Sequence, residues 1–136
     1  MSPVPFPECS NYVGVPYVDR GRGPDGWDCY GLVYYVNNFH LGRQVPSYWL
    51  SYPSALDDEH VQSAIAYHSR EWVEVARDDI RAGDTLVFNL HGLPVHCGIV
   101  YDNIRMLHCL AGRETVLERF DSYAWTKRLQ GVFRWK

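Results

Sequence analysis

The sequence lacks a long apolar run and a cluster of basic residues. Although 46% of its 136 residues are hydrophobic, no apolar stretch approaches the roughly 20 residues that cross a membrane, so we expect no membrane insertion. Arginine and lysine are scattered and the formal net charge is -3, which argues against a nucleic-acid partner. Internal repeats and low-complexity tracts are also missing. The composition therefore predicts a single domain over residues 1–136 with one hydrophobic core.

A secretory signal peptide is also missing from the start of the sequence. Residues 1–7 have neither the basic region nor the apolar region that such a signal needs. We therefore expect synthesis in a cytoplasm without a signal peptide. In that reducing compartment thiols stay unpaired, and the four cysteines are Cys9, Cys29, Cys97 and Cys109.

Two pairs of neighbours, His96-Cys97 and His108-Cys109, offer nitrogen and sulfur ligands of the kinds that bind zinc. Both pairs lie in segments with strand character, and neighbouring residues of a strand point to opposite faces of a sheet. Each face would hold only two of the four ligands, so we expect neither a metal site nor another cofactor. We expect Cys97 and Cys109 to be small core residues on the face away from the histidines.

The most informative segment is Gly-Trp-Asp-Cys-Tyr-Gly-Leu-Val at residues 26–33. Asp28 suits the cap of a helix, and Cys29 suits its first residue. The free N–H groups and the positive dipole end of a helix N-terminus favour a thiolate, which makes Cys29 a candidate nucleophile. The alternative is a buried structural cysteine, because free cysteine behaves as a small hydrophobe. For Asp28, both capping and direct contact with a substrate remain open.

Two histidines are candidates for a general base and for the residue that orients it. His96 and His108 lie in residues 94–108, which read as two strands around a turn at Asp102-Asn103. A two-residue turn would set His96 opposite Cys109, whereas an odd-length connection would set His96 opposite His108 on one face. The turn chemistry slightly favours the first register. Cysteine-hydrolase chemistry, with a nucleophile, a base and an orienting residue, requires the second.

Hydrophobic periodicity predicts two helices followed by a run of strands. The first helix, over residues 29–39, should bury Leu32, Val33, Val36 and Phe39, and the second helix is expected over residues 56–69. The strands are expected at residues 72–75, 85–89, 95–100, 105–109, 115–119 and 131–135. This order predicts an α+β fold in which the nucleophile helix packs on a small antiparallel β-sheet.

Taken together, these segments resemble the NlpC/P60 family of papain-like peptidases. The resemblance is carried, in chain order, by Val13-Gly14-Val15-Pro16-Tyr17, the glycine-rich residues 20–26, Asp28-Cys29, residues 83–88, His96-x-Gly98-Ile99 and His108. It covers residues 11–133, which is nearly the whole chain. Enzymes of this family cleave γ-D-glutamyl bonds to diamino acids in the stem peptides of peptidoglycan.

The resemblance implies a role for each matching residue. It implies Cys29 as the nucleophile, His96 as the base and His108 as the third polar residue. It also suggests that Tyr17 lies beside the oxyanion site, where a phenol can donate a hydrogen bond. From its own context alone, Tyr17 could equally be a core tyrosine.

The chain departs from the family pattern in two places. The residue after the nucleophile, commonly a serine that helps to hold the D-glutamyl group, is Tyr30 here. We therefore expect a narrower subsite, or one that uses the Tyr30 hydroxyl as a ligand. The segment of about residues 43–72 is longer than in compact members, and we expect this insertion to cover or reshape the cleft.

Peptidoglycan lies outside the cytoplasm, so a peptidase without an export signal needs a carrier. Within the resemblance, small leaderless domains with a residue other than serine after the nucleophile are similar to tail-assembly and tail-tip peptidases of phages. We therefore expect synthesis in a bacterial host, a place in the virion tail with other tail-tip proteins, and action at the cell wall. The alternatives are a secretion-system effector, a hydrolase released by lysis, a structural tail-tip protein with an inactive cleft, and a thiol acyltransferase. The last lacks the apolar anchor that lipid substrates usually require.

Overall fold

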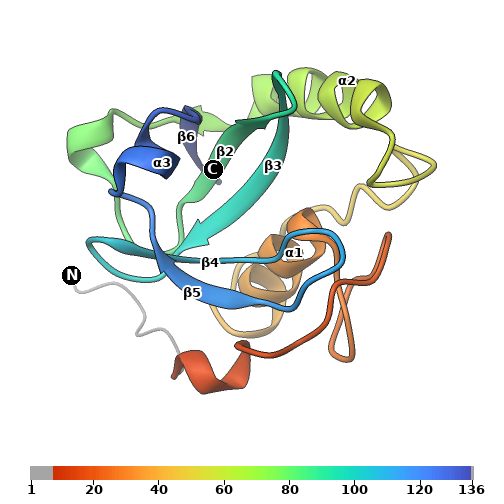
Figure 1. Ribbon diagram of the computed structural model, residues 1–136, viewed down its shortest axis with the longest axis horizontal. Helices are drawn as coiled ribbons and strands as arrows, with labels where there is room; N and C mark the ends of the chain where they lie inside the picture. Colours follow the sequence, from red (N-terminus) through yellow and green to blue (C-terminus); the bar gives the residue numbers. More distant parts are fainter. Residues whose placement is uncertain (1–7, 136) are drawn as a thin grey trace.

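The computed structural model describes residues 8–135, which form a sheet with helices packed on it (Figure 1). The helices are α1 (Cys29–Phe39), α2 (Asp58–His68) and α3 (Tyr123–Thr126), and single 3-10 turns lie at Cys9–Asn11, Ser69–Glu71 and Arg77–Asp79. The strands are β1 (Val73–Glu74), β2 (Thr85–Leu90), β3 (Leu93–Val100), β4 (Arg105–His108), β5 (Val116–Arg119) and β6 (Leu129–Arg134). Within residues 8–135, no helix is long and apolar enough to span a membrane.

The strands form one sheet in the order β1-β6-β2-β3-β4-β5, and all neighbouring pairs are antiparallel. The predicted α+β class is therefore confirmed. Strands β2 and β3 are joined by the two-residue turn His91-Gly92, in which both residues have positive φ, as a tight hairpin requires. Strand β6 returns from the C-terminal end of the chain to pair with β2, which leaves β2 and β3 at the centre of the sheet.

Helix α1 begins at the predicted residue because Asp28 caps it. The backbone N–H of Gly31 donates to Oδ1 of Asp28 at 2.7 Å, which satisfies a group that the helix itself leaves without a partner. The glycine-rich loop of residues 20–26 packs directly against this turn. A Cβ atom at Gly31 would lie 2.0 Å from the carbonyl oxygen of Gly21, so only glycine permits this approach.

The inner face of α1 carries three of the four predicted core residues. Leu32, Val33 and Val36 are fully buried, but Phe39 is 61% exposed, so its prediction as a core residue is wrong. Phe39 occupies the last turn, where its ring packs on those of Tyr34 and Tyr35 instead of on the sheet.

The two faces of the sheet contribute to different hydrophobic clusters. Cys97, Ile99 and Leu107 pack with α1, whereas Phe88, Val100 and other residues of the opposite face pack with Trp125 of α3. Cys97 and Cys109 are buried in the cluster on the α1 side. Their prediction as core cysteines on the face away from the histidines is confirmed.

Of the two registers considered for the histidine strands, β3 and β4 adopt the one with an odd-length connection. Val100 pairs with Met106 and Gly98 pairs with His108, so an odd number of residues, 101–105, lies between the paired residues Val100 and Met106. His96 and His108 therefore lie on one face, but Gly98 rather than His96 is directly opposite His108. The two histidines are diagonal neighbours. At that separation long side chains still reach one another.

Residues 43–57 contain neither helix nor strand, and α2 follows them and packs against β3. The helix predicted over residues 56–69 is shorter than expected because Asp57 acts as its cap and accepts from the backbone N–H of His60 at 3.2 Å. The single-turn helix α3 is absent from the sequence-based assignment, because one turn is too short to show a periodicity.

Candidate active site

The candidate nucleophile, Cys29, is the first residue of α1 and is partly exposed. It lines a cleft together with Tyr17 and His96, and its Sγ lies 3.9 Å from the carbonyl oxygen of Val95. The pKa of the Cys29 thiol lies well below its usual value. The main cause is a hydrogen bond from the Cys97 side chain, and a hydrogen bond and charge from His96 add to it, so that together they outweigh burial.

Cys97 has a second role beside packing. Its hydrogen bond to Cys29 and its burial both raise the pKa of the Cys97 thiol well above the usual value. Cys97 therefore stays a thiol beside Cys29 and favours the thiolate form of Cys29. The alternating strand pattern identified Cys97 only as a core residue. This contact depends on how α1 lies on β3.

The two histidines belong to a longer hydrogen-bonded chain. His96 Nε2 lies 2.9 Å from His108 Nδ1, and His108 Nε2 lies 2.7 Å from Glu118 Oε1. The second carboxylate oxygen of Glu118 accepts from Trp125 Nε1 at 2.9 Å. Strands β3, β4 and β5 and helix α3 thus each supply one member. Both histidines are buried, with exposed fractions of 3% for the whole residue His96 and 0% for the whole residue His108.

The ionisation of this chain follows from its surroundings. Burial, with a further contribution from His96, lowers the pKa of His108 to about 4 despite the opposing effect of Glu118. Burial alone would raise the pKa of Glu118, but the hydrogen bonds from His108 and Trp125 reverse that effect and lower it. Near neutral pH, His108 is therefore a neutral imidazole beside an ionised carboxylate.

Asp28 is the buried cap of helix α1. Its side chain is fully buried, and besides the Gly31 N–H its oxygens accept from the Tyr52 hydroxyl at 2.6 Å and the Arg22 guanidinium at 3.1 Å. Burial is the main cause that raises the pKa of Asp28, the charge of Cys29 adds to it, and Arg22 opposes it. Of the two roles left open for Asp28, this arrangement fits capping and leaves no exposed oxygen for a substrate.

Tyr30 is enclosed by the protein. Its hydroxyl donates to the carbonyl oxygen of Pro46 at 2.6 Å, and its ring packs on that of Tyr48 with centroids 5.3 Å apart. The expectation that the phenol hydroxyl replaces the family's serine as a ligand does not fit this geometry, because the hydroxyl is already used within the fold. What remains is a ring that occupies space next to Cys29.

Tyr17 faces the same cleft as Cys29. Burial, followed by the charge of Cys29, raises the pKa of Tyr17, so its phenol keeps its proton and can donate a hydrogen bond. The position is compatible with the role that the resemblance implies.

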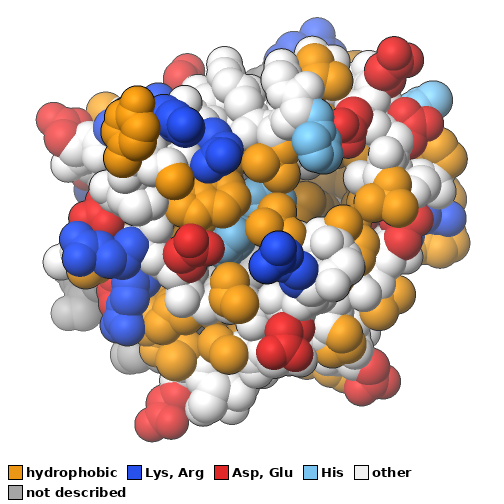
Figure 2. Space-filling view, viewed as in Figure 1, with side chains coloured by type: hydrophobic (Ala, Val, Ile, Leu, Met, Phe, Trp, Pro, Cys, Tyr) orange, Lys and Arg blue, Asp and Glu red, His pale blue; other side chains and the backbone are white. Residues whose placement is uncertain are grey.

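Two hollows meet at Cys29. The first hollow is the cleft that Cys29 shares with Tyr17 and His96; it has a free volume of about 150 Å³, and its lining also includes the apolar residues Leu56, Leu90 and Leu110. Figure 2 shows histidine atoms within a hollow that is bordered mainly by hydrophobic side chains.

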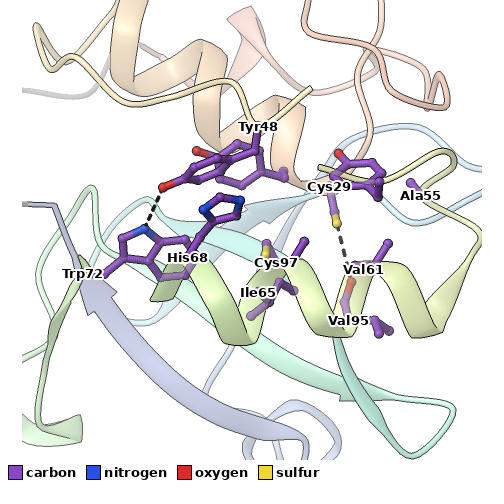
Figure 3. A pocket seen from close by; sticks show the side chains of 12 residues that line it. Cys29, Tyr48, Ala55, Val61, Ile65, His68, Trp72, Val95 and Cys97 are labelled. Carbon is purple, nitrogen blue, oxygen red and sulfur yellow. Dashed lines mark hydrogen bonds between the residues drawn. The ribbon is translucent and has the colours of Figure 1, made fainter. Parts of the chain in front are cut away.

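The second hollow, which we call the apolar pocket, extends from Cys29 towards Trp72 (Figure 3). Its free volume is about 30 Å³, enough for a group no larger than a few heavy atoms. The lining residues are Cys29, Tyr30, Tyr48, Tyr52, Ala55, Val61, Ala64, Ile65, His68, Trp72, Val95 and Cys97. Tyr48 stacks on His68 with ring centroids 3.8 Å apart and accepts from Trp72 Nε1 at 3.2 Å. Most of these walls come from the segment of residues 43–72.

Sequence reasoning missed Glu118, Trp125, Arg22 and Tyr52. A signal for Glu118 was available, because it lies on a predicted strand next to that of His108, and alternate residues of paired strands share a face. Arg22 and Tyr52 carried no such signal. Both residues lie in loops and contact Asp28 from there, and hydrophobic periodicity does not predict the conformation of a loop.

A reduced-pKa thiol at a helix N-terminus, beside imidazoles on an antiparallel sheet, defines the class of papain-like cysteine peptidases. Comparison with known families agrees with that class, since the model of the NlpC/P60 family matches residues 14–134. The chain belongs to the NlpC/P60 family.

Individual relatives are similar over nearly all of this chain. The probable endopeptidase YafL of Escherichia coli (strain K12) is 29% identical over 126 residues, which are 90% of this chain and 45% of YafL. The gamma-DL-glutamyl hydrolase of Bacillus subtilis (strain 168) is 28% identical over 133 residues, which are 93% of this chain and 28% of the hydrolase. The chain thus spans less than half the length of both relatives.

Solved structures share the fold. An NLP/P60 family protein from Staphylococcus aureus aligns with a TM-score of 0.65 at 24% identity, covering 98% of this chain and 44% of that one. The NlpC/p60 domain of the peptidoglycan hydrolase SagA aligns with a TM-score of 0.63 at 20% identity, covering 93% of this chain and 92% of that domain.

Proposed function

We propose that this protein is a cysteine endopeptidase that cleaves γ-D-glutamyl bonds to diamino acids in peptidoglycan stem peptides. The observation that carries the proposal is the thiol of Cys29, with its lowered pKa, next to the hydrogen-bonded pair His96 and His108. Relatives named an endopeptidase and a gamma-DL-glutamyl hydrolase support the bond type.

In the proposed reaction, the Cys29 thiolate attacks the γ-carbonyl carbon of the glutamyl residue. Backbone N–H groups at the start of α1, together with the Tyr17 hydroxyl, donate to the oxyanion that forms. The imidazolium of His96 gives its proton to the departing amine as the C–N bond breaks, which leaves a thioester on Cys29. Water, deprotonated by His96, then hydrolyses the thioester and restores the free thiol.

A defined stem peptide tests the proposed bond. We expect the purified protein to split the tetrapeptide L-Ala-γ-D-Glu-diaminopimelate-D-Ala into two dipeptides, identified by mass spectrometry. The matched control is the same peptide with an α-linked glutamate, which should remain intact because its scissile carbonyl is displaced from Cys29. Cleavage at another bond would contradict the specificity. No cleavage by the folded protein would favour the inactive tail-tip alternative.

A thiol acyltransferase is the second candidate, and the apolar pocket is the observation that favours it. An acyl group bound to Cys29 as a thioester could extend between Val95 and Ile65 without meeting a charged side chain. The two candidates differ in the acceptor of the acyl group. With a short acyl ester and an added amine, a transferase yields the amide, whereas a peptidase yields the free acid as the main product.

We further propose that the protein acts as a component of a phage tail with other tail-tip proteins as partners, and that residues 43–72 restrict access to the cleft. The support is Tyr30 at the position after the nucleophile and the position of Ala55 and Leu56 at the cleft. Mass spectrometry of purified virions from an infected or induced host should detect the protein in the tail fraction. Its detection only in cell supernatants without particles would contradict the tail location.

A further inference from the structure

The hydrogen-bonded chain behind the candidate base extends beyond the third polar residue. Glu118 on β5 accepts from His108 with one oxygen and from Trp125 with the other, at 2.7 and 2.9 Å. The Glu118 side chain is 45% exposed, whereas that of His108 is 1% exposed. The buried imidazole of His108 therefore has a half-exposed carboxylate as its direct hydrogen-bond partner.

These contacts fix which nitrogen of each histidine carries a proton. An ionised carboxylate only accepts hydrogen bonds, so the proton of neutral His108 must be on Nε2, facing Glu118. Nδ1 of His108 is then an acceptor, and the 2.9 Å contact requires that His96 Nε2 donate to it. The remaining nitrogen of His96, Nδ1, is left to exchange a proton with the thiol of Cys29.

The opposite order of protons would disable the base. If His108 carried its proton on Nδ1, it would donate to His96 Nε2, and a neutral His96 would then hold its proton on Nδ1. His96 could not accept a proton from Cys29 there. His96 also could not become an imidazolium, because its Nε2–H would then face the Nδ1–H of His108 at their 2.9 Å contact. The order of protons thus decides whether a thiolate–imidazolium pair can form.

We propose that Glu118 is a positioning residue that sets this order of protons, so that His96 presents Nδ1 to Cys29 as the base. The proposal rests on the proposed function. Trp125 assists by holding the second oxygen of Glu118, since an indole N–H only donates.

The Glu118→Gln variant tests the proposal directly, because the hydrogen bond from Trp125 fixes the orientation of the new amide group. The Trp125 N–H would keep the amide oxygen towards itself, and the amide NH₂ would then face His108 Nε2. An NH₂ group donates, so His108 would have to shift its proton to Nδ1. We expect kcat for the γ-D-glutamyl peptide to fall by roughly 100-fold or more with KM little changed, because a base histidine held in the wrong tautomer loses up to about 10⁴ in kcat.

Two readouts need no substrate. In ¹⁵N-labelled protein, the ring nitrogen–proton correlations of His108 should change from protonation on Nε2 to protonation on Nδ1. The rate of Cys29 alkylation by iodoacetamide at pH 7 should also fall, because the thiolate loses its imidazolium partner. These readouts separate the two proposals. If wild-type protein fails to cleave the peptide but both readouts shift as described, the assignment of Glu118 holds and the proposed substrate is wrong.

Three variants serve as controls. Glu114→Gln removes an exposed carboxylate near the same strand and should leave kcat and the His108 spectrum unchanged. Glu118→Asp keeps an acceptor and should retain more activity than Glu118→Gln. Adding Trp125→Phe to Glu118→Gln frees the amide to turn its oxygen to His108, so activity should partly recover relative to Glu118→Gln alone. Wild-type kcat and unchanged His108 protonation in Glu118→Gln would overturn the proposal.

Discussion

Replacing Cys29 by alanine should lower kcat for stem-peptide cleavage by a factor on the order of 10⁴ or more, because no other group can form the thioester. The fold should persist, since the substitution removes one partly exposed sulfur and leaves the Asp28 cap intact. Steady-state kinetics with circular dichroism would measure both effects. Cys9→Ala is the matched control, because Cys9 lies in a 3-10 turn and does not line the cleft. Retention of activity within tenfold in Cys29→Ala would exclude Cys29 as the nucleophile.

Alkylation provides a second measurement of the same nucleophile. The lowered pKa means that Cys29 is a thiolate at pH values where an ordinary cysteine is protonated, so its reaction with iodoacetamide should continue as the pH falls below about 8. Cys109, whose pKa burial raises, should react far more slowly across this range. Cys97→Ala removes the main cause of the shift and should move the Cys29 profile to higher pH. Equal labelling of Cys29 and Cys109 would contradict an activated thiol.

Replacing Asp28 by alanine should have the largest effect on stability, with a loss of about 3–5 kcal/mol in the free energy of unfolding. The substitution removes the cap of α1 and leaves the charge of Arg22 in a largely buried site without its carboxylate. For a domain of this size, that loss corresponds to a fall in Tm of roughly 10–20 °C. Urea unfolding and thermal melts would measure it.

The control for Asp28 lies three positions earlier in the chain. Asp25 is exposed, and Asp25→Ala should change the free energy of unfolding by no more than about 0.5 kcal/mol. Tyr52→Phe removes only one of the donors to Asp28 and should cost about 1 kcal/mol. If Asp28→Ala were no more destabilising than Asp25→Ala, the buried cluster would not support the nucleophile helix.

Local patterns predicted the parts of the site that depend on neighbouring residues. The start of α1 at Cys29 follows from a capping residue beside an apolar period. The shared face of the two histidines does not follow from local patterns, because the turn residues favour the register that sets His96 opposite Cys109. The diagonal placement of His96 relative to His108 could not be predicted, because it depends on the length of the β3–β4 connection. The correct length differed from the one that the turn residues favoured.

Contacts between distant segments could not be predicted from local patterns. Tyr52 reaches Asp28 from an irregular segment, and Trp125 reaches Glu118 from a helix of a single turn. The burial of Tyr30 against Pro46 is of the same kind. In each case the contact depends on the conformation of the loop that leads to it. Local sequence patterns do not specify that conformation.

Tyr52 belongs both to the wall of the apolar pocket and to the cap of the nucleophile helix. Occupancy of the pocket and stability of the helix start are therefore thermodynamically linked. A ligand that leaves Tyr52 in place raises the melting temperature through its binding energy alone. A bulkier ligand that displaces Tyr52 must also offset the lost hydrogen bond to Asp28, and by reciprocity Tyr52→Phe would selectively improve the affinity of that bulkier ligand.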